Sequence, residues 1–251
     1  MPQVSVRPFE PGDLGPAARL LAARHRRDRA RLPVLRADME DDGTCRVIVE
    51  RLAGNARANG VVANSAGGEV IGFLFGEKMT LAPTAFNSMY VPPHSIAIGV
   101  DAHAVASEAD PTTIYRSMYA SLAEQWVKGG FFEHETHIVA GDRAVEEAWV
   151  NLGFGRGTTA AVRGTGPVEV RHPANVEIHQ ASSEDFAVIG GLSDALTAFH
   201  SRAPIFWPLL TEPHHAAEEV HRGLLADPRN AHFVAYEGGQ PVAMQTFARP
   251  G

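Results

Sequence analysis

The chain has 251 residues, 45% of them apolar, so it can form one large or two small domains with a sizeable core. Its formal net charge of −7 argues against a nucleic-acid partner, which needs a basic surface. The charge is compatible with a cationic or amine substrate, although solubility alone explains it equally well. The single cysteine, Cys45, excludes an intramolecular disulfide framework.

The N-terminal segment, residues 1–11, is polar and contains proline, so it does not have the pattern of a secretory signal peptide. No apolar stretch is long enough to cross a bilayer. A lone cysteine also suits a reducing compartment. From the sequence we therefore expect a soluble cytoplasmic protein with no membrane partner.

The first elements alternate between a short strand and two helices. Residues 3–7 alternate like a strand, and Asp13 is a suitable N-cap for an amphipathic helix. The arginine-rich run 24–31 is interpreted as the solvated end of that helix, with a binding patch as the alternative. A second helix is predicted over residues 45–58.

Strands and two more helices follow up to about residue 165. Asp110 followed by Pro111 predicts the start of a helix that Gly129 ends, and Asp142 predicts the start of another that Gly153 ends. Strands are predicted at residues 60–64, 69–76, 95–106, 134–140 and 157–163. Residues 164–173 have the composition of a linker.

The pattern then starts again, with a predicted strand at 175–180. Three pairs of matching residues are each separated by 172 positions: Asp13 and Asp185, Leu52 and Leu224, and Val62 and Val234. The Gly-Gly hairpin tips at 67–68 and 238–239 deviate from this spacing by one residue. A constant spacing with the same element order indicates a tandem repeat. We predict an α/β fold, a mixed twisted sheet flanked by helices, with a first domain at 1–165 and a second at 172–251.

Two segments carry a resemblance to a known family. The segment VASEADPTTIYRSMYASLAEQWVKGG begins at Val105, and DRAVEEAWVNLGFG begins at Asp142. With the element order, they resemble the GNAT superfamily of N-acetyltransferases. The resemblance covers residues 1–165 and resumes near 172. It implies an acyl-CoA-dependent N-acetyltransferase that transfers acetyl from acetyl-CoA to a small-molecule or peptide amine.

In this family the pantetheine arm of acetyl-CoA lies between two splayed strands, and the pyrophosphate meets backbone N–H groups at a helix N-terminus. The resemblance places the cofactor-binding positions at Val105, Ser107, Thr112, Thr113, Ile114 and Tyr115. The family's two spaced glycines fall on Thr113 and Tyr115, and its Arg or Gln falls on Asp110. With Glu108 nearby, this loop presents two negative charges to a pyrophosphate, which repel it.

The catalytic positions also depart from the family pattern. Trp149 occupies the position of the tyrosine that protonates the leaving thiolate, and an indole N–H is no useful acid. Asp101 and His103 lie where a general base could lie, with placement on the opposite side of the strand, burial or a simple hydrogen bond as open alternatives. The first copy is therefore predicted to have a lost or reshaped acetyl-CoA site. The alternative function is a non-catalytic GNAT-like scaffold or binding module.

Two sets of histidines are candidate metal ligands. His214, Glu218 and His221 share one helix face, which is a possible zinc geometry. The sequence shows neither a further protein ligand nor a residue that would hold these side chains in place. They are therefore interpreted as ordinary polar surface residues, and no metal is predicted. His134 and His137 would point to opposite faces of a strand.

The second copy is expected to end after its hairpin. Its last strand, 241–248, would then lack a neighbour, and an unpaired strand bearing Val242, Met244 and Phe247 invites association. The first copy, another chain in a homodimer, or a crystal neighbour would cover it. On this interpretation the chain is a fragment of a longer tandem enzyme, and its second copy cannot build a cofactor site.

Overall fold

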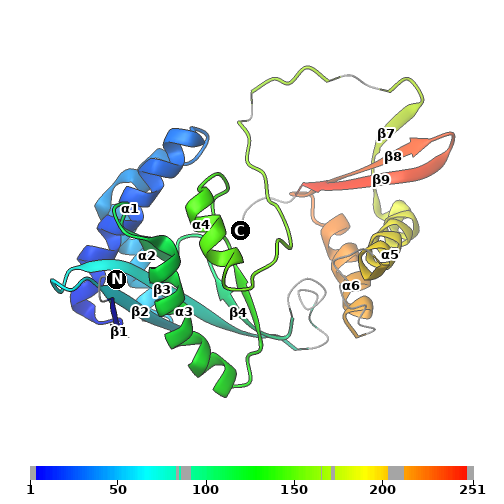
Figure 1. Cartoon of the computed structure of the whole chain (residues 1–251). Coiled ribbons are helices and arrows are strands. Elements are labelled where there is room, and N and C mark those ends of the chain that lie inside the picture. The colour runs from blue at the N-terminus through cyan, green and yellow to red at the C-terminus, as the bar shows by residue number, and fades with distance from the viewer. Residues whose placement is uncertain are drawn as a thin grey trace. The chain divides into compact units, whose positions relative to one another are not determined.

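The computed structural model describes residues 4–82, 85, 92–164, 166–170, 173–202 and 212–247, with the backbone alone for 212–216. The chain divides into two compact units (Figure 1). The first unit comprises Met1–Thr80 and His94–Gly164, and the second comprises Leu81–Pro93 and Thr165–Gly251. Among the described helices, none has both the length and the apolar character that crossing a membrane requires.

The sheet of the first unit has the order β1-β2-β3-β4-β6, with β5 paired to β3. All of these pairs are antiparallel except β4 with β6, which is parallel. Its strands are β1 (Ser5–Pro8), β2 (Ala58–Asn64), β3 (Val70–Thr80), β4 (His94–Ile98), β5 (His103–Val105) and β6 (Glu133–Thr136). The sheet is therefore mixed, as the sequence predicts.

Helices cover both faces of this sheet (Figure 1). They are α1 (Leu14–Arg31), α2 (Asp42–Gly54), α3 (Pro111–Lys128) and α4 (Arg143–Val150). Glycine lets α3 approach β3 closely: a methyl group at Gly72 would lie 2.8 Å from Ile114 Cγ2, and one at Gly76 would overlap the Trp126 ring. The core between these layers includes Trp126 and Trp149, both almost completely buried.

The helix ends follow the predicted caps. Asp110 and Asp142 accept backbone hydrogen bonds at the starts of α3 and α4, and Gly130 ends α3 with a φ of 84°. The predicted helix 45–58 is shifted, because the Asp41 carboxylate accepts from Thr44 N and starts α2 three residues earlier.

Two strand predictions were wrong. The strand predicted at 95–106 is two strands, β4 and β5, because the chain turns at Gly99, where the Ala102 N–H donates to the Gly99 carbonyl. The strand predicted at 157–163 is absent from this described segment. Its side chains are all exposed, so its apolar and β-branched residues bury no surface that would hold a strand in place.

The second unit has a three-stranded antiparallel sheet of order β7-β8-β9, accompanied by two helices that pack on one another (Figure 1). The elements are β7 (Val176–Gln180), α5 (Phe186–Arg202), α6 (Glu212–Ala226), β8 (Ala231–Glu237) and β9 (Gln240–Phe247). In the described residues β9 pairs only with β8, and Val242 and Phe247 are exposed. Residue 248 of the predicted last strand lies outside the described residues.

Details of the two units coincide at the spacing of 172 residues. Val6 pairs with Ala63, and Ile178 pairs with Ala235. The register of the next strand pair shifts directly after Ala63 and directly after Ala235. A capping box joins Glu10 to Asp13 in the first unit and Ser182 to Asp185 in the second. The units thus share strand register, a bulge and a cap at equal spacing.

Candidate functional site

The sheet of the first unit opens where β4 ends. β4 and β6 pair side by side as far as Ile98 and Thr136, and the His137 N–H then donates to the Ile98 carbonyl at 2.9 Å. Beyond the turn at Gly99, β5 pairs with β3 instead. This divergence is the place where the resemblance expects the pantetheine arm of acetyl-CoA.

His103 closes the divergence. Its Nε2 lies 3.1 Å from the His137 carbonyl oxygen, and its Nδ1 lies 2.7 Å from the Tyr115 hydroxyl. Both side chains are buried. Burial, with the nearby Arg24 charge, lowers the pKa of His103 to about 3, while burial raises the pKa of Tyr115 above its usual range. A neutral, hydrogen-bonded imidazole therefore fills the space between the diverging segments.

Arg24 on α1 closes the same region from the other face of the sheet. Its Nη1 donates to the carbonyls of Val100 and His103, both at 2.5 Å. Its other nitrogens form ion pairs with Asp28 at 3.4 Å and Asp101 at 3.6 Å. The prediction of a solvated helix end was therefore wrong for Arg24 and Asp28, which are buried. The backbone carbonyls that face the divergence are already bonded within the chain.

The N-terminus of α3 is occupied by the chain's own carboxylate. Asp110 accepts from the backbone N–H groups of Thr112 at 3.1 Å and Thr113 at 3.2 Å, and from the Thr113 hydroxyl at 2.5 Å. These hydrogen bonds hold the pKa of Asp110 below its usual value, so it is ionised at neutral pH. The donors predicted for a pyrophosphate thus bind an anion that is part of the protein.

The remaining predicted cofactor residues face inward or are bonded locally. Val105 and Ile114 are core residues, as is Tyr115, so only their backbone atoms could meet a ligand. Ser107 is exposed and donates to Glu108 at 2.5 Å, which lowers the pKa of Glu108. The exposed end of this loop therefore carries two ionised carboxylates, as the sequence predicts.

The two predicted catalytic residues lie in different environments. Trp149 is buried in an aromatic cluster, with ring centroids 5.0 Å from Tyr115 and from Phe154 and 5.7 Å from His103. Its indole N–H has no hydrogen-bond partner among the described residues, which fits a packing role rather than proton transfer. Asp101 is partly exposed and pairs with Arg24 rather than with a histidine.

Two buried charged residues of α1, Arg24 and Asp28, were expected from the sequence to be solvated, although they follow the helical spacing of the buried face. Leu21, Arg24 and Asp28 follow one another at helical spacing, so Arg24 and Asp28 lie on the buried face of α1. Their charge favoured a solvated interpretation, although the spacing pointed inward. His103 was recognised as a strand residue, but its link to Tyr115 depends on a contact that the spacing alone does not fix.

The histidine set considered for a metal is not assembled in the described residues. The side chain of His214 lies outside them, and no group of three histidine, cysteine or carboxylate side chains within them could hold an ion. His134 and His137 do differ in surroundings: His134 bonds to Tyr119 at 2.7 Å, whereas His137 is exposed beside Glu135.

Comparison with known proteins relates the fold to solved structures. No protein-family model and no curated protein matches the sequence. A mutant of the BH1408 protein from Bacillus halodurans matches with a TM-score of 0.52 and 10% identity over 64% of this chain and 98% of that chain. A GCN5-related N-acetyltransferase from Ralstonia eutropha matches with a TM-score of 0.47 and 14% identity over 65% and 100%.

A ribosomal-protein-alanine N-acetyltransferase from Brucella melitensis matches with a TM-score of 0.45 and 12% identity over 64% of this chain and 99% of that chain. The structural neighbours thus include acetyltransferases. At such identities the likeness concerns the fold alone. The predicted α/β fold, a mixed sheet flanked by helices, is confirmed by the strand order and by the match to BH1408.

Proposed function

We propose that residues 1–165 form a GNAT-type domain that has lost acetyl-CoA binding and serves as the supporting copy of an acyl-CoA-dependent N-acetyltransferase. On this proposal the acceptor is a small-molecule or peptide amine, and the first copy contributes packing rather than chemistry. The observation that carries the proposal is Asp110, whose carboxylate holds the backbone N–H groups of Thr112 and Thr113. A pyrophosphate would have to displace it and then face Glu108.

The closed divergence of the strands supports the same proposal. A pantetheine arm needs space and free polar groups between the separated strands. Here the His103 ring bridges to the His137 carbonyl, and Arg24 binds the carbonyls of Val100 and His103. Opening the site would expose a histidine and an arginine that are both buried. Such burial of hydrogen-bonded side chains is what a packing role requires.

The second unit is proposed to be the N-terminal half of another copy, residues 172–251. The support is the shared spacing of 172 residues in strand register, bulge and capping box. The backbone hydrogen bond from Phe9 N to the Gly60 carbonyl has its counterpart from Ala181 N to the His232 carbonyl at the same spacing. Such agreement between two segments is typical of repeats built from one ancestral unit.

Calorimetric titration of the full chain with coenzyme A tests the proposal. We expect no binding at micromolar concentrations for the natural chain. A micromolar dissociation constant that Thr113→Glu abolishes would contradict the proposal, because the added carboxylate places a charge at the same helix start. Gln125→Glu is the matched control, since it adds one carboxylate at an exposed position near the other end of the same helix. Acetyl transfer from labelled acetyl-CoA to a mixture of amines is also expected to be absent.

A further inference from the structure

The first unit contains a cavity of about 470 Å³ at the start of α1 and the end of α2. This volume lies within the roughly 300–1,000 Å³ of pockets that bind small molecules. The lining comes from the connection between β1 and α1, the last turns of α2 and the adjoining parts of β2 and β3. It shares no residue with the predicted cofactor-binding and catalytic positions, so the cavity is separate from the closed divergence of the strands.

Two aromatic rings line the cavity. The ring centroids of Phe9 and Phe75 lie 4.8 Å apart, with an angle of 55° between the ring planes. Phe75 is 3% exposed, whereas Phe9 is only partly buried. The Phe75 ring lies directly on Gly60, where a Cβ atom would come within 2.2 Å of it, so the glycine leaves the place that this ring occupies. A planar aromatic molecule can pack against such a pair of rings in a stacked or edge-on arrangement.

The end of α2 brings hydrogen-bond acceptors to the same cavity. Ala53 and Gly54 line it and are the last two residues of the helix. The N–H groups of Arg57 and Ala58, which follow at the spacing of a helical hydrogen bond, donate to Asn55 instead. The carbonyls of Ala53 and Gly54 therefore have no intrahelical partner and lie at the negative end of the helix dipole, where an O–H or N–H group of a ligand can donate to them.

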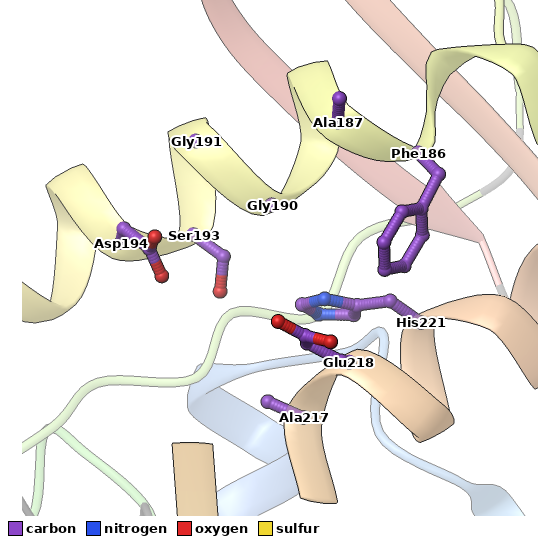
Figure 2. Close-up of a pocket in the computed structure, with 9 residues that line it drawn as sticks. All are labelled: Phe186, Ala187, Gly190, Gly191, Ser193, Asp194, Ala217, Glu218 and His221. Carbon is purple, nitrogen blue, oxygen red and sulfur yellow. The ribbon is translucent and has the colours of Figure 1, made fainter. Parts of the chain in front are cut away.

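The corresponding place in the second unit is filled by side chains of the chain itself. At 172 residues after Leu14 and Glu50, which line the cavity, stand Phe186 and Arg222. The Arg222 guanidinium lies 3.8 Å from the centroid of the Phe186 ring, and Figure 2 shows this ring directed from α5 towards α6. Two planar groups in contact thus stand where the first unit has an aliphatic side chain, a carboxylate and the cavity. This place in the fold therefore suits a planar group.

The second unit is open at a different place, where the first unit is closed. A pocket of about 210 Å³ lies between α5 and α6, and its lining includes Ser193, Asp194 and His221 (Figure 2). The residues 172 positions earlier are fully buried: Leu21, Ala22 and Val49. The two helix pairs are therefore packed differently along their length, and the cavity at α1 and α2 arises from side chains that are particular to the first unit.

We propose that the cavity at the start of α1 and the end of α2 binds a small neutral aromatic compound that carries an O–H or N–H donor. The ring of the compound packs on Phe9 and Phe75, and its donor meets the carbonyls at the end of α2. Of the two carboxylates in the lining, Glu50 pairs with Arg46 at 2.9 Å and Glu10 is exposed to solvent. Neither would hold a cation firmly, and both would repel an anion. The proposal does not depend on whether either unit binds coenzyme A.

Phenol, cyclohexanol and anisole are matched probes, because phenol has both the aromatic ring and the donor, cyclohexanol has only the donor, and anisole has only the ring. Each is titrated into the full chain with labelled phenylalanine, and the nuclear magnetic resonance signal of Phe9 is assigned by its loss in Phe9→Leu. We expect phenol to shift this signal saturably, with a millimolar dissociation constant. Cyclohexanol and anisole are each expected to bind about fivefold more weakly, which is the effect of losing one ring contact or one hydrogen bond.

A filled cavity gives a second test. Ala53→Leu introduces the residue type that the second unit has 172 positions later, at Leu225, and it is expected to weaken phenol binding at least tenfold. Ala53 is exposed and helical, and leucine is a good helix former, so the fold is preserved. Ala120→Leu is the matched control, since it makes the same substitution at an exposed position of α3 outside the cavity lining, and its phenol affinity is expected to be unchanged.

The comparison of the three probes uses the natural chain, so it tests the proposal independently of how the Ala53→Leu variant folds. The absence of a saturable shift with phenol would overturn the proposal. An affinity for cyclohexanol or anisole equal to that for phenol, or full phenol binding by folded Ala53→Leu, would do the same.

Discussion

Lowering the pH from 7 to 5 is expected to destabilise the first unit by about 2 kcal/mol through His103 alone. The folded pKa of His103 is about 3, against an ordinary value of 6.5. Below pH 6.5 the unfolded chain takes up a proton at this position, and the folded chain does not until about pH 3. The contribution to stability is therefore complete above pH 6.5 and is lost as the pH falls toward 3. At about 1.4 kcal/mol per pH unit, the largest loss of stability that His103 can cause is about 5 kcal/mol.

The assay is urea denaturation at pH 7 and pH 5, followed by the fluorescence of Trp126 and Trp149 in a Trp207→Phe background. Trp207 belongs to the second unit, so its removal confines the signal to the first. His103→Gln is expected to lower stability at pH 7 and to reduce the loss between pH 7 and 5 by about 2 kcal/mol, since glutamine does not titrate.

Burial also lowers the pKa of His134, so this residue adds a loss of stability between pH 7 and 5. The added loss is the same in the natural chain and in His103→Gln and therefore cancels when the two are compared. His137→Gln is the control, because it removes an exposed imidazole and keeps the carbonyl that His103 contacts. Equal pH dependence in the natural chain and His103→Gln would refute the reasoning. It would mean that His103 is hydrated in the folded protein and that the divergence of the strands is open.

Three further changes test the closed site and the packing beneath it. Asp110→Ala is expected to cost about 1 kcal/mol in urea denaturation, as the loss of an N-cap does, and an unchanged midpoint would speak against the cap. Trp149→Tyr is expected to restore no acetyl transfer from labelled acetyl-CoA, because the side chain is buried, and any transfer would contradict this. Gly76→Ala is expected to lower the free energy of unfolding by roughly 1–3 kcal/mol, because the added methyl group forces the Trp126 ring aside. Gly190→Ala has open space at its Cβ and is expected to leave the thermal denaturation midpoint unchanged. Equal effects of the two variants would refute the packing argument.

The helix starts and ends were predictable because they depend on neighbouring residues. An aspartate four or fewer residues before an apolar repeat can bond the free N–H groups of the first turn, and Asp110 and Asp142 do so. A glycine at the end can adopt a positive φ, and Gly130 does. The doubled pattern at 172 residues was visible for the same reason, since capping residues and hairpin glycines are local signals.

The closed state of the candidate site was not predictable in the same way. The charges at Glu108 and Asp110 and the helix start at Asp110 were identified from the sequence, but the His103 ring that bonds to Tyr115 and to the His137 carbonyl is seen only once the backbone is placed. The link from Arg24 to the carbonyl of His103 joins segments about 80 residues apart in the chain. Contacts of that separation depend on tertiary packing, which overrides local preference.

The helix pairs α1–α2 and α5–α6 offer a direct test of the correspondence between residues that lie 172 positions apart. Replacing Ser193, Asp194 and His221 together (S193L/D194A/H221V) gives the second unit the side chains that stand 172 residues earlier in the first. If the register is right, the leucine and valine fill the pocket between α5 and α6, and burying such a side chain stabilises by roughly 1.5–3 kcal/mol. Hydrogen exchange of peptides from α5 and α6 should therefore slow, while peptides from the first unit are unchanged. The control is Ala195→Leu with Glu219→Val, which adds apolar side chains to the same two helices at exposed positions outside the pocket lining. Unchanged or faster exchange in the first variant would mean that the helices of the two units are not equivalent, and that the polar pocket does not replace an apolar contact.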